Sequence, residues 1–126
     1  MIHNLATVTV YVEDQERALE FYAHTLGFEI RRRQPMGPHE FWIEVAPPGA
    51  ETRIVLYPRL LMPHWQQLKA SVIFACDDID ATYHELRGRG VHFTQVPRQM
   101  PWGRFAQFTD LDSNEFMLSQ PAPLQP

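Results

Sequence analysis

The sequence predicts an α+β fold built from two tandem βαβββ modules. The first observation is an internal repeat: the run TVTVYVED at residues 7–14 aligns with SVIFACDD at residues 71–78, and both runs end in an acidic pair. The second is that the same order of elements follows each run: an amphipathic stretch, a glycine and three short strand-like runs. We expect modules at about residues 3–57 and 68–119.

Each opening run is a predicted strand, and a predicted helix follows it. Apolar residues recur at helical spacing in both copies: Ala18, Leu19, Phe21, Tyr22 and Leu26 in the first, and Ile79, Thr82, Tyr83 and Leu86 in the second. Asp14 and Asp78 stand where N-caps belong, because their side chains can accept the free N–H groups of a first helical turn. Gly27 ends the first helix, and Gly88 or Gly90 ends the second.

Three further strands are predicted in each module. They span 28–30, 41–45 and 53–57 in the first copy, and 91–93, 104–108 and 115–119 in the second. Residues 58–67 contain two prolines beside apolar side chains, which predicts a linker that packs against its surroundings. Residues 120–126 contain three prolines and few anchoring side chains, so we expect a flexible tail. The whole chain, 1–126, is expected to form one domain.

Composition narrows the classes of partner. The formal net charge is −4 at pH 7, which argues against a nucleic-acid surface, since phosphate binding needs a concentrated positive face. No apolar run approaches the roughly 20 residues of a membrane span, and no signal peptide is recognisable. Cys76 is the only cysteine, so an internal disulfide is excluded. We expect a cytoplasmic protein without a membrane partner.

Several motifs together resemble one family. They are the opening run 5–14, Arg17-Ala-Leu-Glu-Phe-Tyr22, Leu26-Gly-Phe28, Pro101-Trp-Gly103 and the segment 108–114. In this order they resemble the vicinal oxygen chelate superfamily, the group of glyoxalases, bleomycin resistance proteins and extradiol dioxygenases. The resemblance spans about residues 3–119. Leu111 and Ser113 replace the family's usual Pro and Gly, which alters a turn but not the module.

The resemblance implies a curved mixed sheet around a cleft, with a divalent metal held by the first and last strands of each module. The corresponding positions here are Thr7, Val55, Ser71 and Met117. Valine has no donor atom, and a thioether is a weak ligand for such ions. We therefore expect no metal and no other cofactor. Whether the chain is an enzyme stays open.

Strand alternation predicts which side chains line the cleft. The valines at 8, 10 and 12 are expected to pack on the helix, which leaves Thr7 and Thr9 toward the cleft. Trp102 lies in a proline- and glycine-rich stretch, 97–103, which we expect to leave the sheet and to aim Arg104 inward. His39 also lies in a loop before an aromatic strand. The candidate ligand-binding residues are Thr7, Thr9, His39, Trp42, Val55, Tyr57, Ser71, Ile73, Trp102, Arg104, Phe105 and Met117.

Three functions are consistent with such a cleft. The leading expectation is a metal-free protein that binds a small aromatic or antibiotic-like molecule, because hydroxyl, aromatic and apolar side chains suit such a pocket. One alternative is a metal-dependent lyase or dioxygenase with displaced ligands, and another is an interaction module without a working cleft. We also expect a homodimer, because the resembling proteins commonly pair and twofold pairing is the commonest oligomer. Its apolar surface is expected from Leu60, Leu61, Met62 and Trp65.

Overall fold

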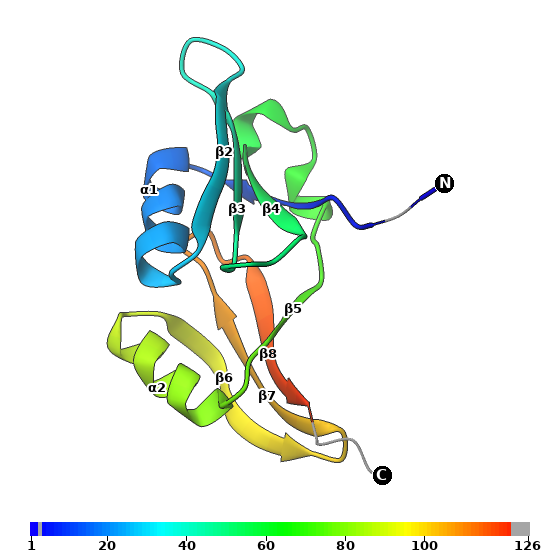
Figure 1. The fold of residues 1–126 in the computed structure, drawn as a ribbon. Helices are drawn as coiled ribbons and strands as arrows, with labels where there is room; N and C mark the ends of the chain where they lie inside the picture. The colour runs from blue at the N-terminus through cyan, green and yellow to red at the C-terminus, as the bar shows by residue number, and fades with distance from the viewer. Residues whose placement is uncertain (3, 122–126) are drawn as a thin grey trace. The chain divides into compact units, whose positions relative to one another are not determined.

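The computed structural model describes residues 1–2 and 4–121 and divides the chain into two compact units, Met1–Ala70 and Ser71–Pro126. Each unit contains one four-stranded mixed sheet with a helix against it (Figure 1). Both sheets are open rather than closed into barrels. The α+β class and the repeated βαβββ order are thereby confirmed.

The first unit follows the predicted order of elements. Its strands and helical segments are β1 (Thr7–Val12), α1 (Gln15–Glu20), the π-helical turn η1 (Phe21–Thr25), β2 (Glu29–Pro35), β3 (Phe41–Ala46) and β4 (Arg53–Pro58). The sheet order is β1-β4-β3-β2, with β1 parallel to β4 and the other pairs antiparallel. Two short 3-10 turns, Arg59–Leu61 and Trp65–Gln67, occupy the predicted linker.

Two side chains at the N-terminal end of α1 fix the start of the helix and connect it to the sheet. Asp14 caps α1, since its Oδ1 accepts the backbone N–H groups of Glu16 and Arg17. Gln15 donates from Nε2 to the carbonyls of Phe41 and Leu56, which belong to two different strands. The apolar side chains between helix and sheet are buried: Val10, Val12, Leu19, Tyr22, Ile43, Val45, Ile54 and Leu56.

The second unit repeats this topology. Its elements are β5 (Val72–Ala75), α2 (Ile79–Gly88), β6 (His92–Met100), β7 (Gly103–Thr109) and β8 (Glu115–Pro121). The sheet order is β5-β8-β7-β6, with β5 parallel to β8. Asp78 caps α2 by accepting the N–H of Ala81. Both predicted N-caps are therefore confirmed, and Gly27 and Gly90 have the positive φ angles, 77° and 93°, that favour glycine at a helix end.

Several predicted boundaries were wrong: β2 extends beyond the predicted 28–30 to Pro35, and β4 includes Pro58 of the predicted linker. Residues 97–100 do not leave the sheet: β6 continues through Pro97 to Met100 and pairs with β7. This is possible because β6 is an edge strand and its register shifts between Gln95 and Arg98, so the missing proline N–H breaks no ladder bond. The expected tail, 120–126, was wrong for Gln120 and Pro121, which belong to β8, and residues 122–126 lie outside the described residues.

Among the described residues, no helix has the length and apolar character needed to cross a bilayer.

Candidate functional site

The sheet of the first unit has one face against α1 and one face away from it. Val10 and Val12 are buried on the helix side, which places Thr7, Thr9 and Tyr11 on the other side by strand alternation. The β1–β4 register sets Thr9 beside Val55 and Tyr11 beside Tyr57. We call this surface the first sheet face.

Three aromatic rings form a row on the first sheet face. The ring centroids of Tyr11 and Tyr57 are 6.1 Å apart, and those of Tyr57 and Trp42 are 6.2 Å apart, both in edge-to-face geometry. All three side chains are only partly buried. Such a row offers ring faces and edges to a planar molecule, because aromatic pairs favour offset and edge-to-face contacts.

A buried carboxylate lies beside this row. Glu44 is 5% exposed and sits directly opposite Val55 in the β3–β4 register. Its Oε2 accepts a hydrogen bond from Trp42 Nε1 at 2.7 Å, and its Oε1 accepts one from Arg53 Nη1 at 2.9 Å. Arg32 Nη1 lies 4.0 Å from Oε2. Glu44 therefore links the aromatic row to two guanidinium groups.

These partners keep Glu44 ionised. Burial alone would raise the pKa of Glu44, because desolvation disfavours the charged form. The hydrogen bonds from Trp42 and Arg53 and the positive charges of Arg53 and Arg32 outweigh it. The pKa of Glu44 is consequently lower than its ordinary value of 4.5.

This lowered pKa predicts a pH-dependent contribution to stability. A carboxyl whose pKa is lower in the folded state stabilises that state above its ordinary pKa, and the contribution disappears as the pH falls through the lower folded value. At pH 7 we expect Glu44→Gln to lower the free energy of unfolding by about 1–3 kcal/mol. Urea denaturation from pH 7 to pH 3 should show the difference shrinking only below about 4.5. The control is Glu16→Gln, which removes an exposed ion pair with Arg33 and should cost under about 1 kcal/mol.

The second unit has an equivalent face away from α2. Register pairs Phe105 with Ser119, Gln107 with Met117, and Ile73 with Met117, so these side chains share one surface. Phe105 is buried, whereas Ile73 is 60% exposed. We call this surface the second sheet face.

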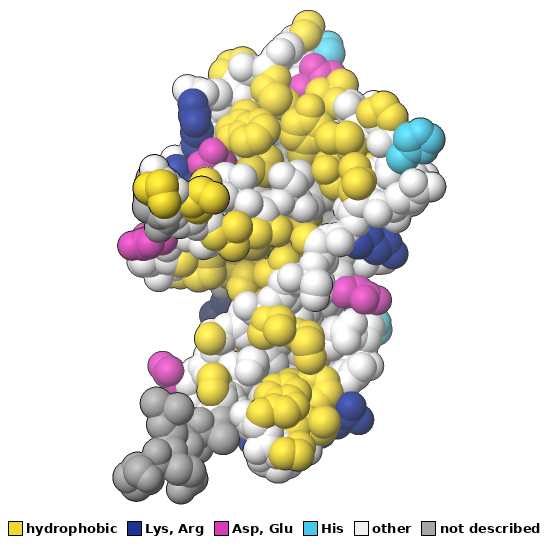
Figure 2. Space-filling view, turned by 90° about the vertical axis from the view of Figure 1, so that its right-hand side faces the viewer, with side chains coloured by type: hydrophobic (Ala, Val, Ile, Leu, Met, Phe, Trp, Pro, Cys, Tyr) yellow, Lys and Arg dark blue, Asp and Glu magenta, His cyan; other side chains and the backbone are white. Residues whose placement is uncertain are grey.

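Trp102 stands at one end of the second sheet face. It lies in the turn between β6 and β7, is 51% exposed, and packs on Phe105 with ring centroids 5.5 Å apart. The Arg98 guanidinium covers Phe105 at 4.7 Å from the ring centroid. Hydrophobic side chains are visible on the surface of both units (Figure 2). Trp102 therefore presents a large aromatic surface to solvent.

Arg104 does not point to the second sheet face. It is the strand neighbour of Phe105, so the two side chains project to opposite sides of β7. Its Nη2 donates to Asp80 Oδ1 of α2 at 2.8 Å. The expectation that alternation aims Arg104 inward beside Phe105 is thus corrected: Arg104 faces the helix.

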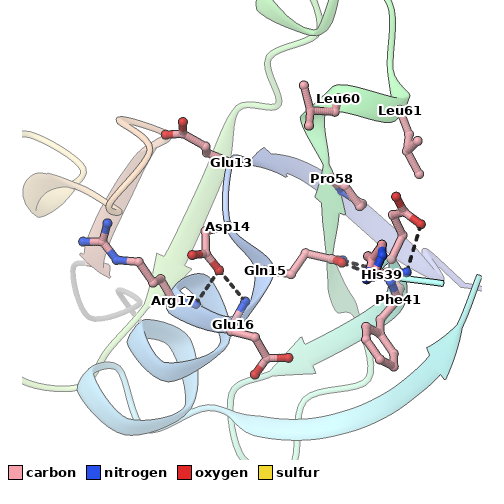
Figure 3. Close-up of a pocket in the computed structure, with 11 residues that line it drawn as sticks. Glu13, Asp14, Gln15, Glu16, Arg17, His39, Phe41, Pro58, Leu60 and Leu61 are labelled. Atoms are coloured by element: carbon pink, nitrogen blue, oxygen red, sulfur yellow. Dashed lines mark hydrogen bonds between the residues drawn. The ribbon is translucent and has the colours of Figure 1, made fainter. Parts of the chain in front are cut away.

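His39 lines a separate hollow of about 560 Å³ in the first unit (Figure 3). The hollow is bounded by the start of α1, the β2–β3 loop and the turn after β4. Asp14 and Gln15 in its wall are already engaged, in the helix cap and in the bonds to β3 and β4. His39 is exposed here and lies in the loop before β3.

The positions that correspond to the family's metal ligands do not suit a metal ion. In the first unit they are Thr7 on β1 and the fully buried Val55 on β4. In the second they are Ser71, exposed before β5, and Met117, beside Ile73. Two hydroxyls, an aliphatic group and a thioether are a poor donor set for divalent ions. Among the described residues, no three His, Cys, Asp or Glu side chains group together in a way that would hold a metal elsewhere.

Comparison with known proteins decides the family. A family model described as the glyoxalase/bleomycin resistance protein/dioxygenase superfamily matches residues 4–118. The chain belongs to this superfamily. The uncharacterized protein YetH of Bacillus subtilis (strain 168) is 49% identical over 120 residues, which cover 95% of this chain and 100% of YetH.

Solved structures of the superfamily share the fold. A member from Sphaerobacter thermophilus DSM 20745 is 36% identical with a TM-score of 0.85, covering 94% of this chain and 98% of its own. TnmS3 from Streptomyces sp. CB03234, an antibiotic binding protein, is 38% identical with a TM-score of 0.82, covering 96% of this chain and 98% of its own. The resemblance to this superfamily that the sequence motifs indicated is therefore confirmed.

The structure gathers most predicted site residues into two groups. Thr7, Thr9, Trp42, Val55 and Tyr57 share the first sheet face. Ile73, Phe105 and Met117 share the second, with Trp102 at its end and Ser71 just before its edge strand. His39 and Arg104 lie apart from both groups. Sequence reasoning missed Glu44 and Arg53, although a glutamate inside the otherwise apolar run 41–45 was a usable signal.

Proposed function

We propose that this protein binds planar aromatic or antibiotic-like small molecules without a metal ion. The observation that carries the proposal is the aromatic row Tyr11–Tyr57–Trp42 on the same sheet face as Thr7 and Val55, two positions with no strong metal donor. A ligand there would meet ring surfaces and hydroxyl groups, which is the mixture typical of small-molecule sites. The 38% identity to the antibiotic binding protein TnmS3 supports the same class of ligand.

Metal analysis tests the metal-free part of the proposal. Protein purified without a histidine tag is expected to contain far less than one divalent ion per chain, and a chelator should leave its melting temperature unchanged. A bound metal would raise the melting temperature, since a ligand of the folded state stabilises it. A fall in melting temperature with chelator, reversed by one particular metal, would favour a metal-dependent lyase or dioxygenase.

We further propose that the protein acts as a homodimer in the cytoplasm. Leu60 is 90% exposed and Leu61 is 44% exposed in the turn after β4, which is apolar surface that a second chain can cover. Light scattering at micromolar concentration is expected to give twice the chain mass of 14.7 kDa. A monomer mass would refute the dimer, and fractionation of cells would test the compartment.

A further inference from the structure

The first sheet face carries more positive than negative charge beside its aromatic row. The Arg53 and Arg32 guanidinium groups share one carboxylate, that of Glu44, at 2.9 Å and 4.0 Å. The Glu44 side chain is 7% exposed, whereas the Arg53 side chain is 39% exposed and that of Arg32 49%. The buried charge is therefore negative and the accessible charge positive.

Arg53 keeps hydrogen-bond donors for another group. Its Nη1 donates to Glu44, and among the described residues no other acceptor binds its guanidinium. A guanidinium has five N–H donors in a planar fork that matches a carboxylate. The donors of Arg53 that Glu44 does not use are thus available to an acidic group that reaches this face.

Glu44 fixes the aromatic and cationic groups relative to each other. One carboxylate oxygen holds the Trp42 indole N–H and the other holds Arg53, so both side chains are tied to one buried, ionised group. Because both oxygens of this buried carboxylate are paired, Glu44 has little conformational freedom and orients Trp42 and Arg53 before a ligand binds.

We infer that Glu44 is a positioning residue that holds Trp42 and Arg53 as paired recognition groups, and that the ligand is a planar aromatic compound with an acidic group, such as a carboxylate. This inference rests on the proposed function and specifies its ligand class. Trp42 and Tyr57 contact the rings, and Arg53 pairs with the acidic group.

Two probes of nearly equal shape test the inference: 2-naphthoate, which is charged at pH 7, and 2-naphthamide, which is neutral. In calorimetric titrations the unmodified protein is expected to bind naphthoate about tenfold more tightly, the effect of a charge-assisted hydrogen bond at a partly exposed site. Arg53→Gln should bring this ratio to about one, because it removes the charge that distinguishes the carboxylate from the amide. The matched control is Arg33→Gln, which also removes one positive charge but from β2, where the side chain pairs with Glu16 of α1. This variant should keep the tenfold preference for naphthoate.

Variants of Glu44 separate positioning from general stability. Glu44→Ala should weaken both probes and shift the Trp42 indole N–H resonance, assigned with Trp42→Phe. Glu44→Gln keeps one acceptor oxygen, which serves the indole but not Arg53 as well, so naphthamide binding should recover while the preference for naphthoate falls. Parallel losses for both probes in Glu44→Gln would contradict positioning.

The outcomes distinguish this inference from the proposed function. Equal binding of the two probes, or a preference that survives Arg53→Gln, would overturn the inference while small-molecule binding stands. Failure of both probes to bind the unmodified protein would overturn both.

Discussion

Phe108→Ala is expected to lower the free energy of unfolding by about 3–5 kcal/mol, the usual range for truncating a buried aromatic side chain. Phe108 is 1% exposed and its ring centroid lies 5.6 Å from those of Phe93 and Phe116 and 6.2 Å from that of Phe74. The cavity would open among the rings of Phe74, Phe93 and Phe116 in the second unit's core. Urea denaturation measures the change.

The control for this variant is Leu111→Ala, in the turn before β8. Leu111 is 54% exposed, so its truncation should change stability by about 0.5 kcal/mol or less. A loss below about 1 kcal/mol for Phe108→Ala would contradict the assignment of β7 faces, and with it the placement of Phe105 and Gln107 on the second sheet face.

Trp102→Ala is expected to weaken binding of planar ligands at the second sheet face by about 1–3 kcal/mol with little change in melting temperature. The reason is that Trp102 is 51% exposed and contacts Phe105 in a turn, so it contributes more to the surface than to the core. Calorimetry and thermal melting on the same variant give both quantities.

Trp65→Ala is the matched control, because Trp65 is also a partly buried tryptophan but belongs to the 3-10 turn Trp65–Gln67, where the Arg59 guanidinium lies 4.7 Å from its ring centroid. It should leave affinity unchanged. Unchanged affinity for Trp102→Ala, together with a large fall in melting temperature, would show that Trp102 is a core residue and would remove it from the site.

The parts of the fold that the sequence predicted depend on local physics. The valines of β1 identify its helix face through the two-residue period of a strand, and Asp14 and Asp78 identify helix starts through the N–H groups they accept. Such signals need only neighbours in the chain. Because the sequence repeats, the strand and the N-cap signals occur once in each module.

The pairings that complete the site could not be predicted, because they depend on register between distant strands. Glu44 meets Arg53 only because β3 and β4 align Glu44 with Val55. Arg104 and Phe105 are neighbours on β7, so they cannot both face the same side of the sheet. The ion pair of Arg104 with Asp80 places Arg104 on the α2 side, and Phe105 is buried on the other side. The sequence around Pro97 does not show that β6 lies at the edge of its sheet, which is the reason the strand can continue through a proline.

A calorimetric titration of a planar aromatic compound, such as 2-naphthoate, into protein stripped of divalent ions with a chelator shows whether binding needs a metal ion. We predict saturable binding with the same affinity before and after stripping, because the residues at the family's metal positions are poor donors and the aromatic row needs no ion. Binding that is lost on stripping and returns with one divalent metal would contradict metal-free binding of planar aromatic compounds, as would no binding under either condition.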